Sequence, residues 1–318
     1  MATIAIIGAA GHIGFTAGEA FARAGWTVKG IGRGTRVSEM PAGVVPAAAD
    51  AFDASSLIDA TRGANVILHA ANPAYDKWET TVLPMVENAI AAAKAHGATL
   101  MIPGNGYNFG LEIGMDVGED APQHASTDKA RIRIAMEERL ERATREEGVQ
   151  VIILRAGDFY GGPKGGTWLD LMILKDLKKG KFTWPGPWIL PHAFAYLPDL
   201  ARAFVALAER RAELGRFERF HFAGHTLTGE QMLAAAEQAS GRRLKRANVN
   251  WTMLKLVGLF MPVVREVVKM SYLWRTAHSL DGARLEALVG PLHVTPPADA
   301  LRQAITDQRL DGPARRAA

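Results

Sequence analysis

The stretch Ile4-Ala5-Ile6-Ile7-Gly8-Ala9-Ala10-Gly11-His12-Ile13-Gly14 decides the fold of this 318-residue chain. It predicts a buried strand, a glycine turn and the start of a helix. Gly8 would allow a tight turn, Gly11 would let a ligand approach the backbone, and Gly14 would let the helix pack closely on the strand. The free N–H groups and the dipole of a helix N-terminus attract anions such as a diphosphate.

We therefore interpret this stretch as a dinucleotide-binding turn, because the glycines stand between a strand and a helix of a βαβ unit. A glycine-rich turn without a ligand is the alternative. The residues expected to line the diphosphate are Gly8, Ala10, Gly11, His12, Ile13 and Gly14.

Short apolar segments alternate with longer helical patterns through the first half of the chain. Strands are expected at 3–7, 27–31, 43–48, 65–69, 99–102 and 151–154, and helices at 12–24, 55–61, 78–96 and 127–146. Ser55 or Ser56 is the candidate cap of the second helix. This alternation predicts an α/β fold with a doubly wound parallel (Rossmann) sheet. Continuous apolar runs such as 151–154 suit strands that are buried on both faces.

The pattern loosens after Gly161. Residues 1–160 are predicted to form the dinucleotide-binding domain and residues 161–318 a smaller, mostly helical substrate lobe, with part of 190–225 returning to the sheet. Helices are expected at 199–211, 229–240 and 252–259. Aromatic side chains in this lobe would either line a substrate pocket or pack its core: Trp168, Trp184, Trp188, Phe194 and Tyr196.

Composition excludes several classes of protein. The chain has no cysteine, so disulfides, thiolate metal sites and cysteine nucleophiles are excluded. Its net charge of +4 comes without a basic stripe interleaved with aromatics, so no nucleic-acid partner is expected.

Residues 253–264 are apolar but too short to span a bilayer, which predicts a buried helix or lid and no membrane partner. A cytoplasmic location is the default in the absence of a secretory signal. A homodimer is compatible with the sequence.

The end of the second strand indicates which dinucleotide is preferred. NAD-selective sites usually place an acidic residue there, which bonds the adenosine ribose. This chain instead has Gly32-Arg33-Gly34-Thr35-Arg36. The guanidinium groups of Arg33 and Arg36 could pair with a 2′-phosphate, although they could also be solvated loop arginines. We therefore predict NADP(H), with NAD(H) as the alternative.

Several further motifs resemble the extended or atypical branch of the short-chain dehydrogenase/reductase superfamily, the NAD-dependent epimerase/dehydratase family. The resemblance rests on the glycine spacing, on Ala49-Asp50-Ala51-Phe52-Asp53, on His69-Ala70-Ala71-Asn72, on residues 155–161 and on Tyr196-Leu197-Pro198-Asp199. It covers residues 3 to about 230. It implies that Asp50 contacts the adenine, that residues 70–72 line the cofactor and that residues 155–161 lie beside the nicotinamide. The implied cofactor-binding residues are Asp50, Ala70, Ala71, Asn72, Lys129 and Arg155.

The catalytic residues of the family are incomplete in this chain. The resemblance implies a Ser, together with a Tyr and a Lys four residues apart on one helix face, where the Lys lowers the pKa of the Tyr. Lys129 matches the Lys, which would hold the nicotinamide ribose. Ala125 stands where the Tyr is expected, and residues 102–110 after the fifth strand contain no Ser.

Other side chains could replace the missing acid. Tyr107 follows the fifth strand at the carboxyl edge of the sheet, where ligands bind. Tyr107 and Lys129 are our candidate catalytic residues. Tyr75 and His192 are candidate substrate contacts. A packed aromatic is the alternative for each tyrosine, and a structural histidine is the alternative for His192. His124 is expected to be a surface loop residue.

The function expected from these motifs is that of an NAD(P)(H)-binding oxidoreductase or epimerase-like protein acting on a small carbonyl or alcohol substrate. A non-catalytic NADP(H) sensor that contacts a partner protein is the alternative. His221 and His225 have a metal-ligand spacing, but Phe220-His221-Phe222 alternates like a strand, so no metal is expected.

Overall fold

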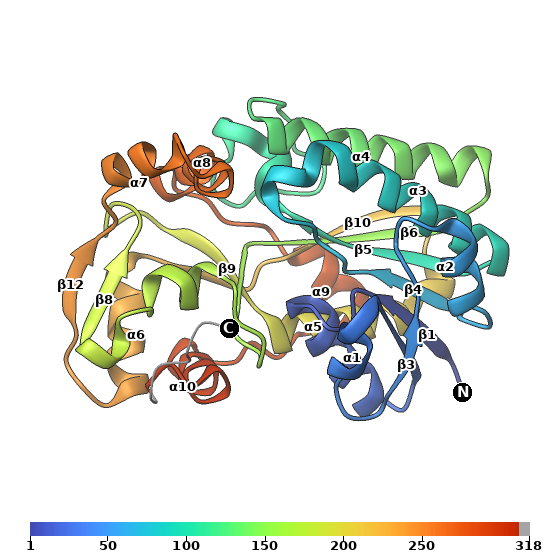
Figure 1. Ribbon diagram of the computed structural model, residues 1–318, viewed down its shortest axis with the longest axis horizontal. Helices are drawn as coiled ribbons and strands as arrows, with labels where there is room; N and C mark the ends of the chain where they lie inside the picture. Colours follow the sequence, from blue (N-terminus) through green and yellow to red (C-terminus); the bar gives the residue numbers. More distant parts are fainter. Residues whose placement is uncertain (312–318) are drawn as a thin grey trace.

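Seven parallel strands form the central sheet of the computed structural model, which describes residues 1–311 (Figure 1). All six strand pairings are parallel. The order reverses between β1 and β4, so the ligand crevice of such a fold opens at the carboxyl ends of these strands. Across the sheet the strands are β10 (Phe217–Phe222), β6 (Val151–Ala156), β5 (Thr99–Asn105), β4 (Val66–His69), β1 (Thr3–Ile7), β2 (Thr27–Gly32) and β3 (Val44–Ala48).

Helices cover both faces of this sheet, which confirms the predicted doubly wound α/β fold. Successive residues of a strand point to opposite faces, so Ile4 and Ile6 pack under one set of helices while Ala5 and Ile7 pack under the other. One layer contains α1 (His12–Arg23), α5 (Leu197–Arg210) and α9 (Ala283–Val289), and the other contains α2 (Ala54–Ala60), α3 (Trp78–His96) and α4 (Asp128–Glu146).

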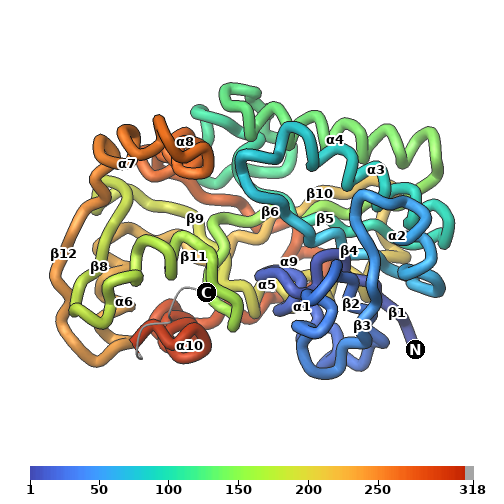
Figure 2. Tube along the Cα trace, viewed as in Figure 1, coloured from blue at the N-terminus to red at the C-terminus, as the bar shows by residue number. Residues whose placement is uncertain are grey.

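The second lobe has its own apolar core beside the carboxyl edge of the sheet (Figure 2). Helices α6 (Gly229–Ser240) and α10 (Pro297–Gln308) pack there with two small sheets. Trp184, Phe194 and Tyr196 are buried in this core, so packing is their role. The small sheets pair β8 (Lys181–Trp184) with β12 (Lys245–Asn248), and β9 (His192–Tyr196) with both β7 (Asp158–Tyr160) and β11 (His225–Leu227).

Two local expectations are wrong. Helix α2 is capped by Asp53, whose carboxylate accepts from the backbone N–H of Ser56 at 3.1 Å, and not by Ser55 or Ser56. The apolar stretch 253–264 is not a buried helix: it forms α7 (Trp251–Gly258) and the start of α8 (Pro262–Lys269), and much of it is exposed. Apolar composition alone does not distinguish a core helix from an exposed one.

A buried ion pair joins the second helix layer to the sheet. The guanidinium of Arg155 on β6 donates to both carboxylate oxygens of Glu137 on α4, at 2.6 and 2.8 Å. A second nitrogen donates to Nε2 of His221 at 2.8 Å, while Nδ1 of His221 donates to the carbonyl of Val117. Burial first, and then the charge of Arg155, lowers the pKa of His221 to about 4. His221 is therefore neutral at pH 7 and can accept this hydrogen bond.

Replacing Glu137 by Ala should destabilise the protein by about 3–5 kcal/mol, because it leaves the charge of Arg155 buried without its carboxylate. Urea unfolding gives this free energy. Glu138→Ala is the matched control, since Glu138 is exposed on the same helix, and it should change stability by less than about 0.5 kcal/mol. Equal effects of the two substitutions would contradict the role given to the buried pair.

Candidate functional site

The glycine turn brings the backbones of β1, α1 and β4 into direct contact. Gly8 has φ +85°, and a Cβ there would lie 2.7 Å from Cα of Ala71. A Cβ on Gly14 would lie 2.3 Å from the carbonyl oxygen of Gly8. No side chain caps the N-terminus of α1, which begins after Gly11, and its first turn has no acidic residue. These features leave an anion site at the helix N-terminus, and they fit the diphosphate of a dinucleotide.

The end of β4 forms the second wall of this turn. The N–H of Ala70 donates to the carbonyl of Ile7 at 2.9 Å, and Ala71 rests against Gly8. Asn72 follows in an exposed position. The structure thus brings Ala70 and Ala71 beside Gly8.

A glycine-rich strap, defined as residues 161–166, lies over the start of α1. Gly166 has φ +112°, and a Cβ there would lie 2.8 Å from the ring of His12. Nζ of Lys164 is 5.0 Å from the centroid of the Phe15 ring, on the first turn of α1. The same Nζ is paired with the carboxylate of Glu39 at 3.2 Å, so the strap carries a cation next to the first turn of α1 that already has an acidic partner. Sequence reasoning missed Lys164, although the run Gly161-Gly162-Pro163-Lys164-Gly165-Gly166 is the signal that could have found it.

Arg33 and Asp50 meet after β2 and β3. The guanidinium of Arg33 donates to the carboxylate of Asp50 at 3.0 Å, and the two side chains are 72% and 38% exposed. The backbone N–H of Phe52, and secondarily Arg33, lowers the pKa of Asp50. Arg36 is exposed in the following turn. The two residues that sequence analysis assigned to the adenosine end therefore adjoin, and the exposed pair between them is worth little to stability.

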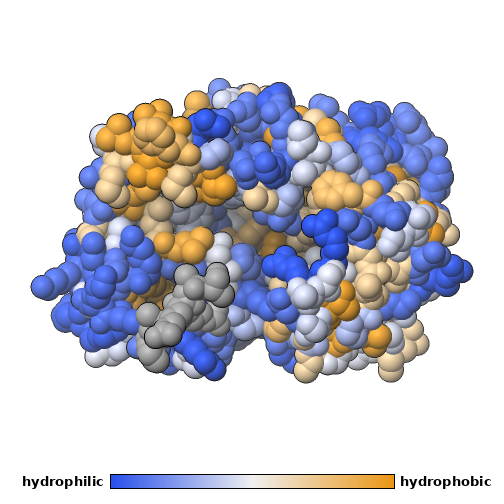
Figure 3. Space-filling model, in the orientation of Figure 1, coloured by the Kyte–Doolittle hydropathy of each residue, from blue (hydrophilic) through white to orange (hydrophobic). Residues whose placement is uncertain are grey.

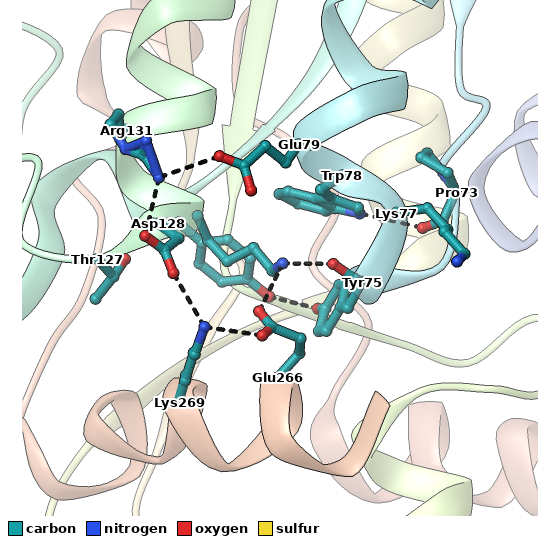
Figure 4. A network of polar contacts seen from close by, with 12 residues as sticks. Pro73, Tyr75, Lys77, Trp78, Glu79, Thr127, Asp128, Arg131, Glu266 and Lys269 are labelled. Atoms are coloured by element: carbon teal, nitrogen blue, oxygen red, sulfur yellow. Dashed lines mark hydrogen bonds and ion pairs between the residues drawn. The ribbon is translucent and has the colours of Figure 1, made fainter. Parts of the chain in front are cut away.

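Figure 4 shows a network of polar contacts that includes Tyr75, Glu266 and Lys269, and the buried side chain of Lys129 belongs to it. Its Nζ donates to the backbone carbonyl of Tyr75 at 2.5 Å and lies 3.0 Å from a carboxylate oxygen of Glu266 on α8. The other oxygen of Glu266 is 2.8 Å from Nζ of Lys269, which also reaches Asp128 at 3.0 Å. Glu266 thus neutralises Lys129 from the far end of the chain. No sequence motif pointed to Glu266.

Two phenols adjoin this network. The hydroxyl groups of Tyr75 and Tyr107 are hydrogen-bonded at 2.8 Å. Burial is the main cause that raises the pKa of each, and the pKa of Tyr107 lies well above its usual value. Within residues 1–311, Nζ of Lys129 makes no hydrogen bond to either phenol oxygen. Both phenols are therefore protonated at neutral pH and can donate hydrogen bonds.

A cavity of about 20 Å³ lies at the carboxyl ends of β5 and β6. A volume of this size holds about one water molecule. Residues from both halves of the chain enclose the cavity. The first half contributes residues at the strand ends, and the second half contributes Leu273 and His278. The lining includes Asn105, Tyr107, Gly157, Asp158, Leu273 and His278.

The side chains of Arg155 and His192 are both engaged with protein partners, and His192 lies directly behind the cavity, next to its lining residues Asp158 and His278. Arg155 is fully buried beneath α4 in its pair with Glu137. His192 is 3% exposed, bonds the carboxylate of Asp158 at 2.8 Å and stacks on Trp274 with ring centroids 3.9 Å apart. A sequence motif gives a residue's place on a strand but not the partner that its side chain finds.

His221 and His225 lie on two separate strands, β10 and β11. Among residues 1–311, no group of three or more His, Asp or Glu side chains could hold a metal ion. Over the same residues, no helix is both long and apolar enough to cross a membrane.

Solved structures of similar fold include two 4-epimerases and an enzyme solved with NAD⁺. WbmH from Bordetella bronchiseptica, solved with NAD⁺, is 18% identical with a TM-score of 0.75 and coverage of 97% of this chain and 98% of its own. The Brucella ovis UDP-glucose 4-epimerase, solved with NAD, is 15% identical with a TM-score of 0.74 and coverage of 99% and 100%. The Bacillus cereus UDP-N-acetylglucosamine 4-epimerase is 14% identical with a TM-score of 0.77 and coverage of 97% of each chain. At these identities the likeness shows the fold.

No curated protein matches the sequence. The family model named NAD dependent epimerase/dehydratase family matches residues 4–222, which is more than half of the chain. The match spans the glycine turn, the end of β4, Lys129 and the sheet through β10. The chain therefore belongs to the NAD-dependent epimerase/dehydratase family.

Proposed function

We propose that this protein binds NADP(H) at the glycine turn and reduces the carbonyl group of a small substrate. The observation that carries the binding half is the cradle around Gly8 and Gly14, which leaves no room for a Cβ and exposes a helix N-terminus. Gly11 and its neighbours would bond the diphosphate through their N–H groups, and Lys164 on the strap would add a positive charge. The bound dinucleotide would supply a hydride.

Arg33 supports NADP(H) over NAD(H). Its guanidinium is exposed beside Asp50 at the end of β2, where an NAD-selective site would carry an acid. A 2′-phosphate would take the place of the Asp50 carboxylate as the partner of Arg33. It carries more negative charge than a carboxylate, and its oxygens match the planar guanidinium fork. Arg36, one turn further along, would add to the same positive field.

Tyr107 would act as a proton donor in carbonyl reduction. Oxidation of an alcohol needs a base, and burial disfavours the phenolate form of Tyr107. Carbonyl reduction needs a proton donor instead. The carbonyl carbon would gain the hydride, and the developing alkoxide oxygen would gain the proton of Tyr107, which lines the cavity. The hydroxyl of Tyr75, at 2.8 Å, would orient Tyr107 and pass on to it a proton taken from solvent, so that both phenols end protonated.

Lys129 would hold the hydroxyl groups of the nicotinamide ribose once it is released from Glu266. The Lys129–Glu266 pair also favours a second candidate function, a dinucleotide sensor without turnover, because the lysine is neutralised and contacts neither phenol oxygen in the described chain.

Loss of NADPH absorbance with a panel of aliphatic and aromatic aldehydes and ketones separates the reductase from the sensor. Turnover supports the reductase, and binding without turnover across the panel supports the sensor.

Gly14→Ala should weaken NADPH binding about tenfold or more, because the added Cβ meets the carbonyl oxygen of Gly8 and must displace the turn. Fluorescence titration measures the affinity, and thermal unfolding checks that the variant is folded. Gly114→Ala is the control, since a Cβ there meets nothing within 4 Å. Wild-type affinity in folded Gly14→Ala would rule out the turn as the binding site.

Arg33→Ala should weaken NADPH binding about tenfold, which is the loss expected for a charged hydrogen bond, and leave NADH binding almost unchanged. Titration of both dinucleotides gives the ratio of affinities. Arg23→Ala removes an arginine of similar exposure, 69%, from the far end of α1 and serves as the control. An equal loss for both dinucleotides in Arg33→Ala would refute the assignment of Arg33 to the 2′-phosphate.

Tyr107→Phe should lower the rate of carbonyl reduction by about 100-fold or more, the usual contribution of a positioned acid, without changing NADPH affinity. Tyr75→Phe keeps the proton donor Tyr107 and removes only the hydroxyl bonded to it, so the rate of carbonyl reduction should fall less in this variant than in Tyr107→Phe. Single-turnover kinetics with saturating NADPH measure the step. A wild-type rate in Tyr107→Phe would show that another group supplies the proton.

A further inference from the structure

Seven of the fifteen exposed large hydrophobic side chains of the described chain lie within eleven consecutive residues. They cover the α7–α8 hairpin, defined as residues 251–269, and form the continuous apolar area over α7 and α8 in Figure 3. Phe260 at its tip is 87% exposed. Contiguous apolar surface of this kind marks an interaction site. The seven residues are Met253, Leu256, Val257, Leu259, Phe260, Met261 and Val263.

The α7–α8 hairpin is held firmly by its base while its tip is free. Trp251 donates to the carbonyl of Pro185 at 2.7 Å, and Glu266 is tied to Lys129 at the other end. The two helices are in close contact, since a Cβ on Gly258 would lie 3.0 Å from Cα of Arg265. The apolar tip is therefore presented by a fixed support.

The backbone N–H groups at the tip are paired within the turn. The N–H of Leu259 donates to Leu256 at 3.2 Å, and those of Phe260 and Met261 both donate to Val257 at 3.0 Å. These donors are satisfied within the turn, so they do not need water. Backbone groups that enter the apolar part of a bilayer must be satisfied in this way.

The ionisable side chains of the tip segment itself are cationic. Between residues 252 and 265 the ionisable side chains are Lys255 and Arg265, and both are exposed. Glu266, the first acid, is buried and turned to Lys129. A projecting apolar tip with cations on its flanks complements an anionic bilayer surface, where each Lys or Arg adds to the attraction.

We propose that the α7–α8 hairpin docks on an anionic lipid surface. Leu259, Phe260 and Met261 enter the headgroup region, and Lys255 and Arg265 contact lipid phosphates. This is surface binding without a spanning helix, and it departs from the sequence-based expectation that no membrane is involved. The proposal is independent of the dinucleotide and of any reaction.

Flotation of the full chain with vesicles tests the proposal. One set consists of phosphatidylcholine alone, and the other of phosphatidylcholine mixed with phosphatidylglycerol. We expect binding to the anionic vesicles that salt weakens, and about tenfold weaker binding for the tip variant Leu259→Ser/Phe260→Ser/Met261→Ser. The charge variant Lys255→Gln/Arg265→Gln should also bind less. The control Ile189→Ser removes another exposed apolar side chain, 77% exposed, and should bind normally.

Sedimentation of the same proteins without lipid gives their oligomeric state. Absence of wild-type binding to anionic vesicles overturns the proposal. So does a tip variant that floats like the wild type, or a tip variant that loses self-association while vesicle binding persists, which would assign the tip to a second copy of the chain. The substitutions lie on exposed positions, so unchanged thermal unfolding is expected and is checked for each variant.

Discussion

Gly8 and Ala71 bring the backbones of β1 and β4 so close that no side chain fits between them. Gly14 repeats this constraint between α1 and the turn. Together they aim the N-terminus of α1 at the crevice where the strand order reverses, and they leave it uncapped. The strap over His12, the Arg33–Asp50 pair and the end of β4 all surround this point. The site depends on the close contact of the glycine turn with the end of β4 and with the start of α1, which only glycine permits at positions 8 and 14.

A second constraint comes from the other end of the chain. Glu266 on α8 reaches Lys129 on α4, so a buried charge pair fastens the second lobe to the helix layer over the sheet. Breaking such a pair leaves an uncompensated charge, so any ligand that takes Lys129 from Glu266 must offer polar partners in return. The same carboxylate fixes the base of the α7–α8 hairpin. Glu266 therefore joins the helix that carries the proposed lipid-docking tip to the proposed cofactor lysine.

The sequence predicted what local pattern and backbone chemistry determine. The strands β1 to β6, the turn at Gly8 and the helices Trp78–His96 and Gly229–Ser240 follow from apolar periodicity and glycine placement. It did not predict partners that are distant in sequence. The pairing of Arg155 with Glu137, and the contacts of His192 with Trp274 and Asp158, could not be read from the sequence. The short strands β8 and β12 carry no local signal because they pair only with each other. The apolar stretch 253–264 was misread because periodicity does not tell which side of a helix is left uncovered.

Hydrogen exchange of the wild-type protein with and without NADPH tests the central claim most directly, because it locates the ligand on the backbone. The account predicts slower exchange in peptides that cover residues 8–16, 69–73 and 161–166, since the first helical turn, the end of β4 and the strap all face the proposed diphosphate. Protection confined to the second lobe, or none at saturating NADPH, would contradict it.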